Sequence, residues 1–299
     1  MNNIDIDGIV NKFDQQREIF MVTLNYREAD KVIELCRRVS QMSVFTKIIV
    51  VDNCSGDGSV EKLKKFVKLF SNILLIESKS NQGYSAGYNQ GLKYIIENYK
   101  SDFIFIINPD VVFDECLARA CIDTHVENSE YGLISTRLIG VDGHEEIGAW
   151  KYPTYKQYLL FNFLLLSKIK RYSTTEKVNE GLEIMDVAAV RGSFLCFKTE
   201  AIKAAGFFDE NVFLYNEENI ISKKLHKVGY RIGLLTKWFY HHNHHPQIST
   251  NKIKRIYFMS NYYYQCHYNS INILQRILLR CSIIVGLVEK RIINFILKG

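Results

Sequence analysis

Residues 102–110 read DFIFIINPD, an apolar run that ends at once in Asn108, Pro109 and Asp110. A run of this length and composition predicts a strand that is buried on both faces, as in a parallel sheet. Proline ends the strand because it has no amide N–H to donate to a ladder. The sequence therefore predicts a carboxylate, that of Asp110, just beyond the carboxyl end of a buried strand.

Three earlier runs have the same character and predict neighbouring strands: IFMVTLN at 19–25, KIIVVDN at 47–53 and ILLIES at 73–78. The stretches that separate the four runs have the apolar spacing of helices, over 28–40, 59–70 and 86–99. Strands that alternate with helices predict an α/β fold with a mostly parallel sheet and helices on both faces. Because ligands of such sheets bind beyond the carboxyl ends of the strands, the polar residues there are the first candidates for a site.

The second half of the chain is less regular. We expect further strands within 131–149, and a strand, loop and strand over 187–198 followed by a helix at 199–205. The apolar, aromatic run at 155–172 is too short to span a bilayer and predicts a core helix or an interfacial segment. A further helix begins at an acidic cluster and ends at Gly229.

Composition narrows the class of protein. With 47% hydrophobic residues and three prolines, the chain of 299 residues is typical of a globular protein rather than a disordered or collagen-like one. Its seven cysteines include no CxxC pair, which favours a reduced, cytoplasmic protein. We expect no signal peptide and no membrane span, because the chain has neither a basic and apolar leader nor 18 apolar residues in a row.

Residues 251–299 carry eight lysines and arginines against one acid, Glu289, whereas the rest of the chain is nearly neutral. Apolar residues recur at helical spacing over 271–297. This basic amphipathic tail predicts one of three partners: an anionic membrane surface, the body of the same chain, or a second subunit of a homodimer. Nucleic acid is a poorer fit, because the body has no net positive charge and no groove-reading motif.

The predicted strands place two carboxylates where they could bind a ligand. Asp52 follows IIVV, and its carboxylate is suited either to accept hydrogen bonds from a base or ribose or to cap the loop before Ser59. Asp110 is suited to a divalent cation that bridges diphosphate oxygens, although Asn-Pro-Asp is also a common turn. The first strand is not followed by GxGxxG, which disfavours a dinucleotide-dependent oxidoreductase.

Acids and histidines in the second half supply further candidates. Glu218 is suited to act as a general base, although acids in the first turn of a helix also stabilise its dipole. The stretch YHHNHH at 240–245 is the densest group of histidines in the chain. One of its imidazoles could complete a metal site begun by Asp110, and an exposed polar loop is the alternative.

Six stretches, in a fixed order, resemble the motifs of family 2 glycosyltransferases. They are VTLNYRE at 22–28, VVDNCSGDGS at 50–59, NQGYSAGYNQG at 81–91, NPDV at 108–111, RGSFLCFK at 191–198 and GFFDENVFLYNEEN at 206–219. More narrowly, NQGYSAGYNQG and NPD resemble the bacterial rhamnosyltransferase-like branch, which assembles surface polysaccharides. The resemblance covers residues 20–245 and implies a GT-A fold, Rossmann-like with a central sheet flanked by helices. We expect an N-terminal arm over 1–18, the GT-A domain over 19–245 and a C-terminal helical extension over 246–299.

The resemblance implies that a sugar is transferred, with inversion, from dTDP-rhamnose or a UDP-hexose to a glycan or polyprenyl-linked acceptor. An enzyme of this kind would work at the cytoplasmic face of the plasma membrane. By the same resemblance, the residues around the donor are Thr23, Asn25, Asp52, Asn81, Gly83, Ala86, Gly87, Asn89 and Asn108. Gly192 and Ser193 fall on the acceptor side.

Asp110 corresponds, by resemblance, to the metal-binding carboxylate of a DxD motif, and Glu218 to the catalytic base. Asn108 stands where the first acid of that motif is usual, which leaves two alternatives: weak binding of Mn²⁺ or Mg²⁺, or binding that depends on His242 or His244. Glu218 stands where the family usually has Asp, which leaves Glu217 as an alternative base. These departures keep a second hypothesis open, a catalytically silent module that binds nucleotides or glycans.

Overall fold

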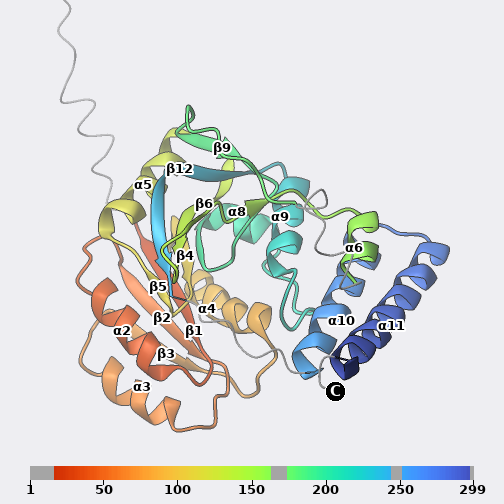
Figure 1. The fold of residues 1–299 in the computed structure, drawn as a ribbon. Helices are drawn as coiled ribbons and strands as arrows, with labels where there is room; N and C mark the ends of the chain where they lie inside the picture. The colour runs from red at the N-terminus through yellow and green to blue at the C-terminus, as the bar shows by residue number, and fades with distance from the viewer. Residues whose placement is uncertain (1–16, 163–173, 244–250, 297–299) are drawn as a thin grey trace, which may run out of the picture.

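The computed structural model describes residues 17–162, 174–243 and 251–296. Figure 1 shows a body built around a sheet, with two long helices, α10 (Asn251–Tyr268) and α11 (Ile273–Ile296), beside it. Most of the expected N-terminal arm lies outside the described residues, and so does His244.

The first half of the body is the predicted parallel sheet. Its strands pair in the order β3-β2-β1-β4, with all three pairings parallel. The bounds are β1 (Ile19–Asn25), β2 (Lys47–Asp52), β3 (Ile73–Glu77) and β4 (Phe103–Ile107). All four strands lie within the apolar runs that predicted them, because each run is long enough to be buried and ends in polar residues.

Beyond β4 the sheet continues with strands from the second half, in the order β11-β6-β12-β5. β11 is antiparallel to both β4 and β6, whereas β6 and β12 are parallel to each other. These strands are β5 (Val111–Val112), β6 (Tyr131–Gly140), β11 (Phe194–Lys198) and β12 (Arg231–His242). Shorter strands are β7 (Glu145–Glu146) on β6, β9 (Ile184–Asp186) on β12, and the separate pair β8 (Ala149–Trp150) and β10 (Ala189–Val190).

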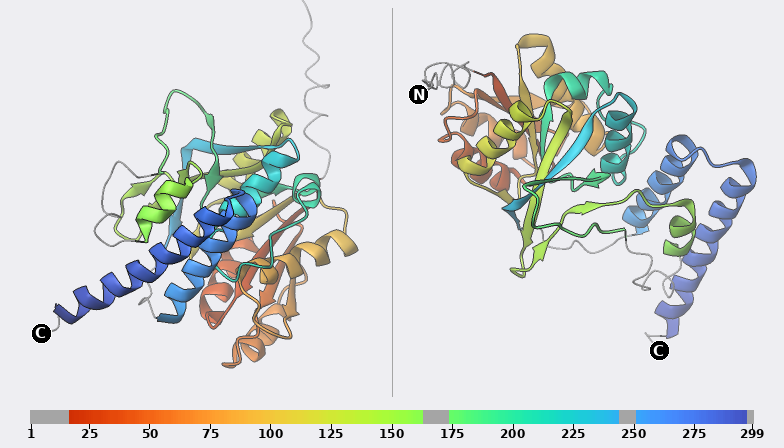
Figure 2. Two further views of the ribbon diagram at one scale, coloured as in Figure 1. Left: turned by 90° about the vertical axis from the view of Figure 1, so that its right-hand side faces the viewer. Right: turned by 90° about the horizontal axis from the view of Figure 1, so that it is seen from above.

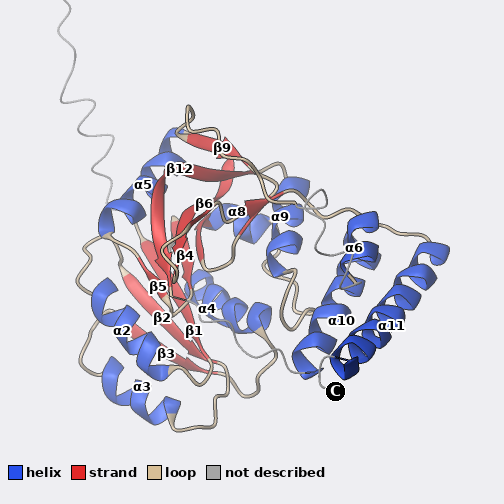
Figure 3. Cartoon of the chain, in the orientation of Figure 1, coloured by secondary structure: helices blue, strands red, loops and turns tan. Residues whose placement is uncertain are grey.

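Helices cover both faces of this sheet (Figure 3). On one face lie α2 (Ala29–Val39), α3 (Ser59–Val67) and α5 (Glu115–Glu127), and on the other α4 (Tyr84–Asn98), α8 (Thr199–Ala204) and α9 (Glu217–Lys227). Alternate strand residues divide between the two cores: Met21 packs on the first face, Phe20 and Val22 on the second. This division follows from the period of two in a strand, and it confirms the predicted α/β architecture.

The tail helices pack on the body of their own chain, one of the three partners expected for them. Figure 2 shows α10 and α11 side by side, next to α6 (Tyr155–Phe161). A third apolar cluster joins these helices to α9 and includes Tyr158, Ile220, Tyr264 and Leu279. Within the described ranges, no helix has both the length and the hydropathy needed to cross a bilayer.

Candidate active site

The polar residues after β1 and β2 form a buried hydrogen-bond network. Asn25 Nδ2 donates to Asp52 Oδ2 over 2.6 Å, and the Asp52 carboxylate also accepts from the amide (3.0 Å) and hydroxyl (2.7 Å) of Ser55. Thr23, Asn25 and Asp52 are at most 1% exposed. Asp52 therefore caps the turn that leads to Ser55. That Thr23, Asn25 and Asp52 bind the nucleoside stays a prediction.

Asn53, to which the sequence analysis gave no role, connects the two loops at this edge of the sheet. Its Nδ2 donates to Asn81 Oδ1 at 3.0 Å and to the Gly83 carbonyl oxygen at 3.1 Å. Its Oδ1 is buried and has no hydrogen-bond partner among the described residues. A buried polar atom left without a partner costs about 1–3 kcal/mol, so this oxygen is a good acceptor for a ligand. The sequence could have indicated this role, because Asn53 is the polar residue that ends the run KIIVVDN.

Gly83 brings the loop before α4 against the segment that precedes α9. We call this loop the donor-side loop, after the predicted role of its residues Asn81 and Gly83. The residue has φ 99° and ψ −173°, a backbone conformation that is essentially confined to glycine. A Cβ at this position would lie 2.1 Å from the Phe213 carbonyl oxygen. The next amide, of Tyr84, donates to the same carbonyl over 2.8 Å. The loop is therefore fixed to the part of the chain that carries the two glutamates.

Ala86, Gly87 and Asn89 are buried residues of α4, the helix that follows this loop. A Cβ on Gly87 would lie 2.5 Å from Leu24 Cδ1, so glycine lets α4 approach β1 closely. Asn89 is 1% exposed, and its amide bonds the Phe208 carbonyl oxygen and the Phe208 amide at 3.0 and 3.1 Å. The structure thus gives Asn89 a role in holding the loop before α9, and its place beside the donor stays a prediction.

Asp110 and His242 come together at the end of β4. His242 Nε2 lies 3.4 Å from Asp110 Oδ1, and both side chains are 9% exposed. β12 brings the imidazole there because it pairs with β5, the strand that follows Asp110, with His242 opposite Val111. His241, the preceding residue, is exposed. Among the described residues no group of three or more His, Cys, Asp or Glu side chains could hold a metal ion, so Asp110 and His242 offer two candidate ligands rather than a complete set.

Glu218 lies against Gly192, the predicted acceptor-side residue. The Gly192 amide donates to Glu218 Oε1 at 3.3 Å, and the Tyr84 hydroxyl donates to the Gly192 carbonyl oxygen at 2.7 Å. A Cβ on Gly192 would lie 3.1 Å from Glu218 Oε1, so glycine leaves room for the carboxylate. Burial raises the pKa of the Glu218 carboxyl, while hydrogen bonds from backbone amides and the charge of Arg191 oppose that rise.

Glu217 has a different environment, although it is the neighbouring residue on α9. It is 5% exposed, and its Oε2 has no hydrogen-bond partner among the described residues. Burial raises the pKa of the Glu217 carboxyl well above its usual range, and the charge of Glu218 raises it further. Of the two acids, Glu218 is therefore the one in contact with the acceptor-side residue.

The segment formed by Gly192 and Ser193 links the two halves of the site. The Asn108 amide donates to the Ser193 carbonyl oxygen over 2.9 Å, and the Ser193 hydroxyl lies 2.7 Å from the Tyr240 hydroxyl. The Asn108 side chain accepts a hydrogen bond from Tyr88 at 3.1 Å. Contacts thus run without a break from Glu218 through Gly192 and Ser193 to Asn108, two residues before Asp110. The arrangement places the carboxylate of Glu218 on one side and the Asp110–His242 pair on the other.

Comparison with known proteins identifies the family. The model of glycosyl transferase family 2 matches residues 19–178, which is more than half of the chain. The chain belongs to glycosyl transferase family 2. Two curated relatives of this family 2 chain are a low-salt glycan biosynthesis hexosyltransferase of Haloferax volcanii (23% identity over 72% of this chain) and an N-acetylglucosaminyl-diphospho-decaprenol L-rhamnosyltransferase of Mycobacterium tuberculosis (24% over 65%). The chain spans 64% and 66% of the length of these two relatives.

Solved structures show that the family 2 chain has the GT-A fold. A mannosyltransferase of Pyrobaculum calidifontis in complex with GDP-Man and Mn²⁺ superposes with a TM-score of 0.58 at 13% identity, over 92% of this chain and 74% of its own. GalNAc-T7 with UDP, GalNAc and Mn²⁺ superposes with a TM-score of 0.60 at 13% identity, over 84% and 50%. Both resemblances concern the fold, and both confirm the expected architecture.

Proposed function

We propose that this family 2 glycosyltransferase moves a sugar, with inversion, from dTDP-rhamnose or a UDP-hexose to a lipid-linked glycan in the synthesis of a cell-surface polysaccharide. The observation that carries the proposal is the set of contacts that runs from Glu218 through Gly192 and Ser193 to Asn108, two residues before Asp110. Asp110 in turn lies beside His242. The rhamnosyltransferase relative, whose name includes a diphospho-decaprenol, supports the class of acceptor.

In this proposal Glu218 removes the proton from the attacking hydroxyl of the acceptor. The hydroxyl oxygen then forms a bond to the anomeric carbon from the face opposite the diphosphate, and the bond from that carbon to the diphosphate oxygen breaks. A raised pKa suits this role, because a carboxylate that holds its proton more tightly is a stronger base. The contact with Gly192 orients the carboxylate, and Tyr84 fixes Gly192 in turn.

The side chains of Asp110 and His242 fit a divalent cation, Mn²⁺ or Mg²⁺. One carboxylate and one imidazole supply two ligands, and such cations commonly take their remaining ligands from substrate phosphates and water. When bound, the cation would offset the negative charge that develops on the leaving diphosphate. The two solved structures with bound Mn²⁺ support this assignment.

We also propose that α11 attaches the enzyme to the cytoplasmic face of the plasma membrane. Apolar side chains are strongly exposed along this helix, among them Ile273 (73%), Leu274 (62%) and Ile277 (52%). Contiguous exposed apolar surface of this kind marks interaction sites. The basic residues of 251–299 would add roughly 1 kcal/mol each near an anionic leaflet, an attraction that salt weakens.

A thermal-shift panel of UDP, dTDP, GDP and NAD, each with and without Mn²⁺, tests the proposed function. A ligand at about 100 times its dissociation constant should raise the melting temperature by roughly 5–10 °C. We expect UDP or dTDP to stabilise the protein, and Mn²⁺ to increase that effect. Stabilisation by NAD alone would contradict the proposal. Nucleotide binding without release of nucleoside diphosphate in the presence of donor and acceptor would favour the silent binding module.

A further inference from the structure

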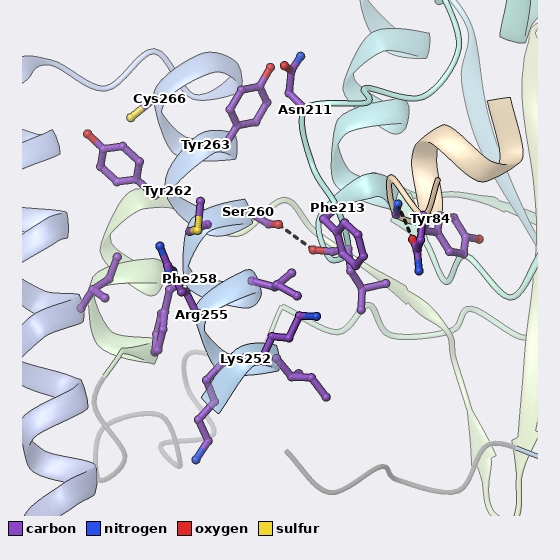
Figure 4. A pocket seen from close by; sticks show the side chains of 18 of the residues that line it. Tyr84, Asn211, Phe213, Lys252, Arg255, Phe258, Ser260, Tyr262, Tyr263 and Cys266 are labelled. Atoms are coloured by element: carbon purple, nitrogen blue, oxygen red, sulfur yellow. Dashed lines mark hydrogen bonds between the residues drawn. The ribbon is translucent and has the colours of Figure 1, made fainter. Parts of the chain in front are cut away.

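A large cavity lies between the body and the tail helices, and we call it the tail groove. Its volume is about 1760 Å³, and its lining comes from three places: the donor-side loops, the segment 211–214, and the facing sides of α10 and α11. Figure 4 shows α10 in the middle of this region, with Tyr84 and Phe213 on one side and α11 on the other. The groove is thus formed where the tail meets the donor side of the site.

Most of the tail groove is apolar, and much of that surface is open. Met259 on α10 is 61% exposed and Ile284 on α11 is 62% exposed, although both line the groove. Ile256, Ile283 and Leu287 extend the same lining. Removing such side chains from water is favourable by about 25 cal/mol of free energy per Å² of apolar area. An apolar ligand would therefore be stabilised here.

The groove also carries positive charge from side chains of both tail helices. Lys252, Lys254 and Arg255 line it from the first turns of α10, and Arg280 lines it from α11, stacked 4.8 Å from the ring centroid of Tyr262. None of the described residues that line the groove is acidic. Four cations beside an apolar surface complement a ligand with an anionic head and a hydrocarbon chain.

The position of the groove, beside the proposed active site, indicates which anionic lipid would bind there. Asn53, Asn81, Gly83 and Tyr84 line one end of it. Tyr84 donates to Gly192, and Gly192 donates to Glu218, so two successive hydrogen bonds connect this end of the groove to the proposed base. A lipid diphosphate bound here would lie beside the loop that holds Asn81 and Gly83, on the wall of the groove that is connected to Glu218.

We propose that the tail groove holds the acceptor lipid, with the polyprenyl chain along α10 and α11 and the diphosphate on the basic residues of α10. This inference rests on the proposed function, and it assigns a binding site to residues outside the donor motifs. It also gives the tail a second role besides membrane attachment. Ile283, Ile284 and Leu287 of α11 line the groove, whereas the exposed apolar residues Ile273 and Leu274 lie outside it.

Two variants of α11 separate these roles. Ile284→Glu puts a carboxylate inside the groove, and Leu274→Glu puts one on the same helix outside it. Both residues are 62% exposed, so neither change should unfold the chain. Isothermal titration of the full chain with geranylgeranyl diphosphate, in EDTA, measures the affinity for a lipid diphosphate. We expect Ile284→Glu to weaken it at least tenfold and Leu274→Glu to change it less than twofold.

Charge is tested by the double variant Lys254→Gln and Arg255→Gln. It should remove the preference for geranylgeranyl diphosphate over geranylgeraniol, while inorganic pyrophosphate should bind the wild-type protein at least tenfold more weakly than the prenyl diphosphate. Equal affinity of wild type and Ile284→Glu for geranylgeranyl diphosphate would overturn the inference. An equal loss of affinity for geranylgeranyl diphosphate in both α11 variants would also overturn it. So would variants that lose only their flotation with vesicles of phosphatidylglycerol, because the groove would then be part of a membrane-docking face.

The same samples are titrated with UDP and dTDP in the presence of Mn²⁺. Nucleotide binding without prenyl diphosphate binding would overturn the inference about the groove and leave the proposed function standing. Prenyl diphosphate binding without binding of either nucleotide would contradict the proposed function instead.

Discussion

His242 Nε2 lies 3.4 Å from Asp110 Oδ1, although the two residues are more than a hundred positions apart in the sequence. Two strands at the edge of the sheet create this proximity, since β5 follows Asp110 and β12 ends in His242. The pair supplies one carboxylate and one imidazole where the NPD motif has Asn108 instead of a second acid. The relationship makes His242 a candidate ligand that takes the place of the missing carboxylate.

Removing either member of the pair should abolish the effect of the metal on nucleotide binding. We expect Asp110→Asn and His242→Gln to lose an enhancement by Mn²⁺ of about tenfold, or 1.4 kcal/mol, in the affinity for UDP or dTDP. Binding in EDTA should be unchanged, because the cation is then absent. Isothermal titration with and without Mn²⁺ measures both values. His241→Gln is the matched control, since that imidazole is exposed, and an enhancement that survives in His242→Gln would contradict the assignment.

The two glutamates of α9 should respond differently to the same substitution. Glu218→Gln removes the base that contacts Gly192 and should lower the rate of transfer roughly 10²- to 10⁴-fold, with nucleotide affinity retained. Glu217→Gln should reduce the rate less than tenfold. A coupled assay for released nucleoside diphosphate gives the rates. If Glu217→Gln has the larger effect, the base is Glu217.

The rate of transfer should rise with pH over a range above the usual pKa of glutamate, about 4.3. Burial raises the pKa of Glu218, and a base acts only when it has lost its proton, so activity is lost as the pH falls through that raised value. The charge of Arg191 opposes the rise in pKa. Arg191→Gln should therefore move the acid limb of the pH–rate profile to higher pH.

Because Arg191 is partly exposed and also paired with Glu146 at 2.6 Å, the displacement should be small and should shrink in high salt. Arg231→Gln, which removes an exposed arginine paired with Glu130, is the control and should leave the limb in place. A limb that moves to lower pH in Arg191→Gln would show that another group controls the profile.

Gly83 should tolerate substitution worse than another glycine with positive φ. Gly83→Ala would bring a Cβ to 2.1 Å from the Phe213 carbonyl oxygen, so the donor-side loop must move away from that segment. Gly58 has φ +88°, but its Cβ would meet nothing within 4 Å, so Gly58→Ala costs about 1–2 kcal/mol of backbone strain alone. Differential scanning calorimetry should show a lower melting temperature for Gly83→Ala than for Gly58→Ala, together with weaker nucleotide binding. Equal melting temperatures would mean that the contact with Phe213 is unimportant.

The parallel half of the fold could be predicted closely from the sequence. The runs at 19–25, 47–53, 73–78 and 102–110 each gave a strand, because complete burial requires uninterrupted apolar residues and the ends are marked by polar ones. The sequence of β12 has no such uninterrupted apolar run. Thr236, Lys237 and Trp238 interrupt it, and the register against β6 shifts between Leu235 and Phe239. The position of such an irregular strand is set by pairing with its neighbours β6 and β9, which a periodic pattern in the sequence does not reveal.

The candidate site could be predicted in part, for the same physical reasons. The position of Asp110 follows from the strand before it, which is a local property. The choice between neighbouring residues is not local: His242 rather than His241 faces Asp110 because successive residues of β12 point to opposite sides. In the same way, successive residues at the start of α9 point in different directions, so Glu218 contacts Gly192 whereas Glu217 is buried without that contact.

The central claim is that the cation pair and the base serve one donor molecule, and crystals soaked with Mn²⁺ and either UDP or dTDP test it most directly. Anomalous scattering from manganese locates the ion independently of the protein. The account predicts one strong peak between Asp110 and His242, in contact with the nucleotide diphosphate, with open space from there to Glu218. A peak at any other place, or protein atoms that close off Glu218 from the diphosphate, would contradict it.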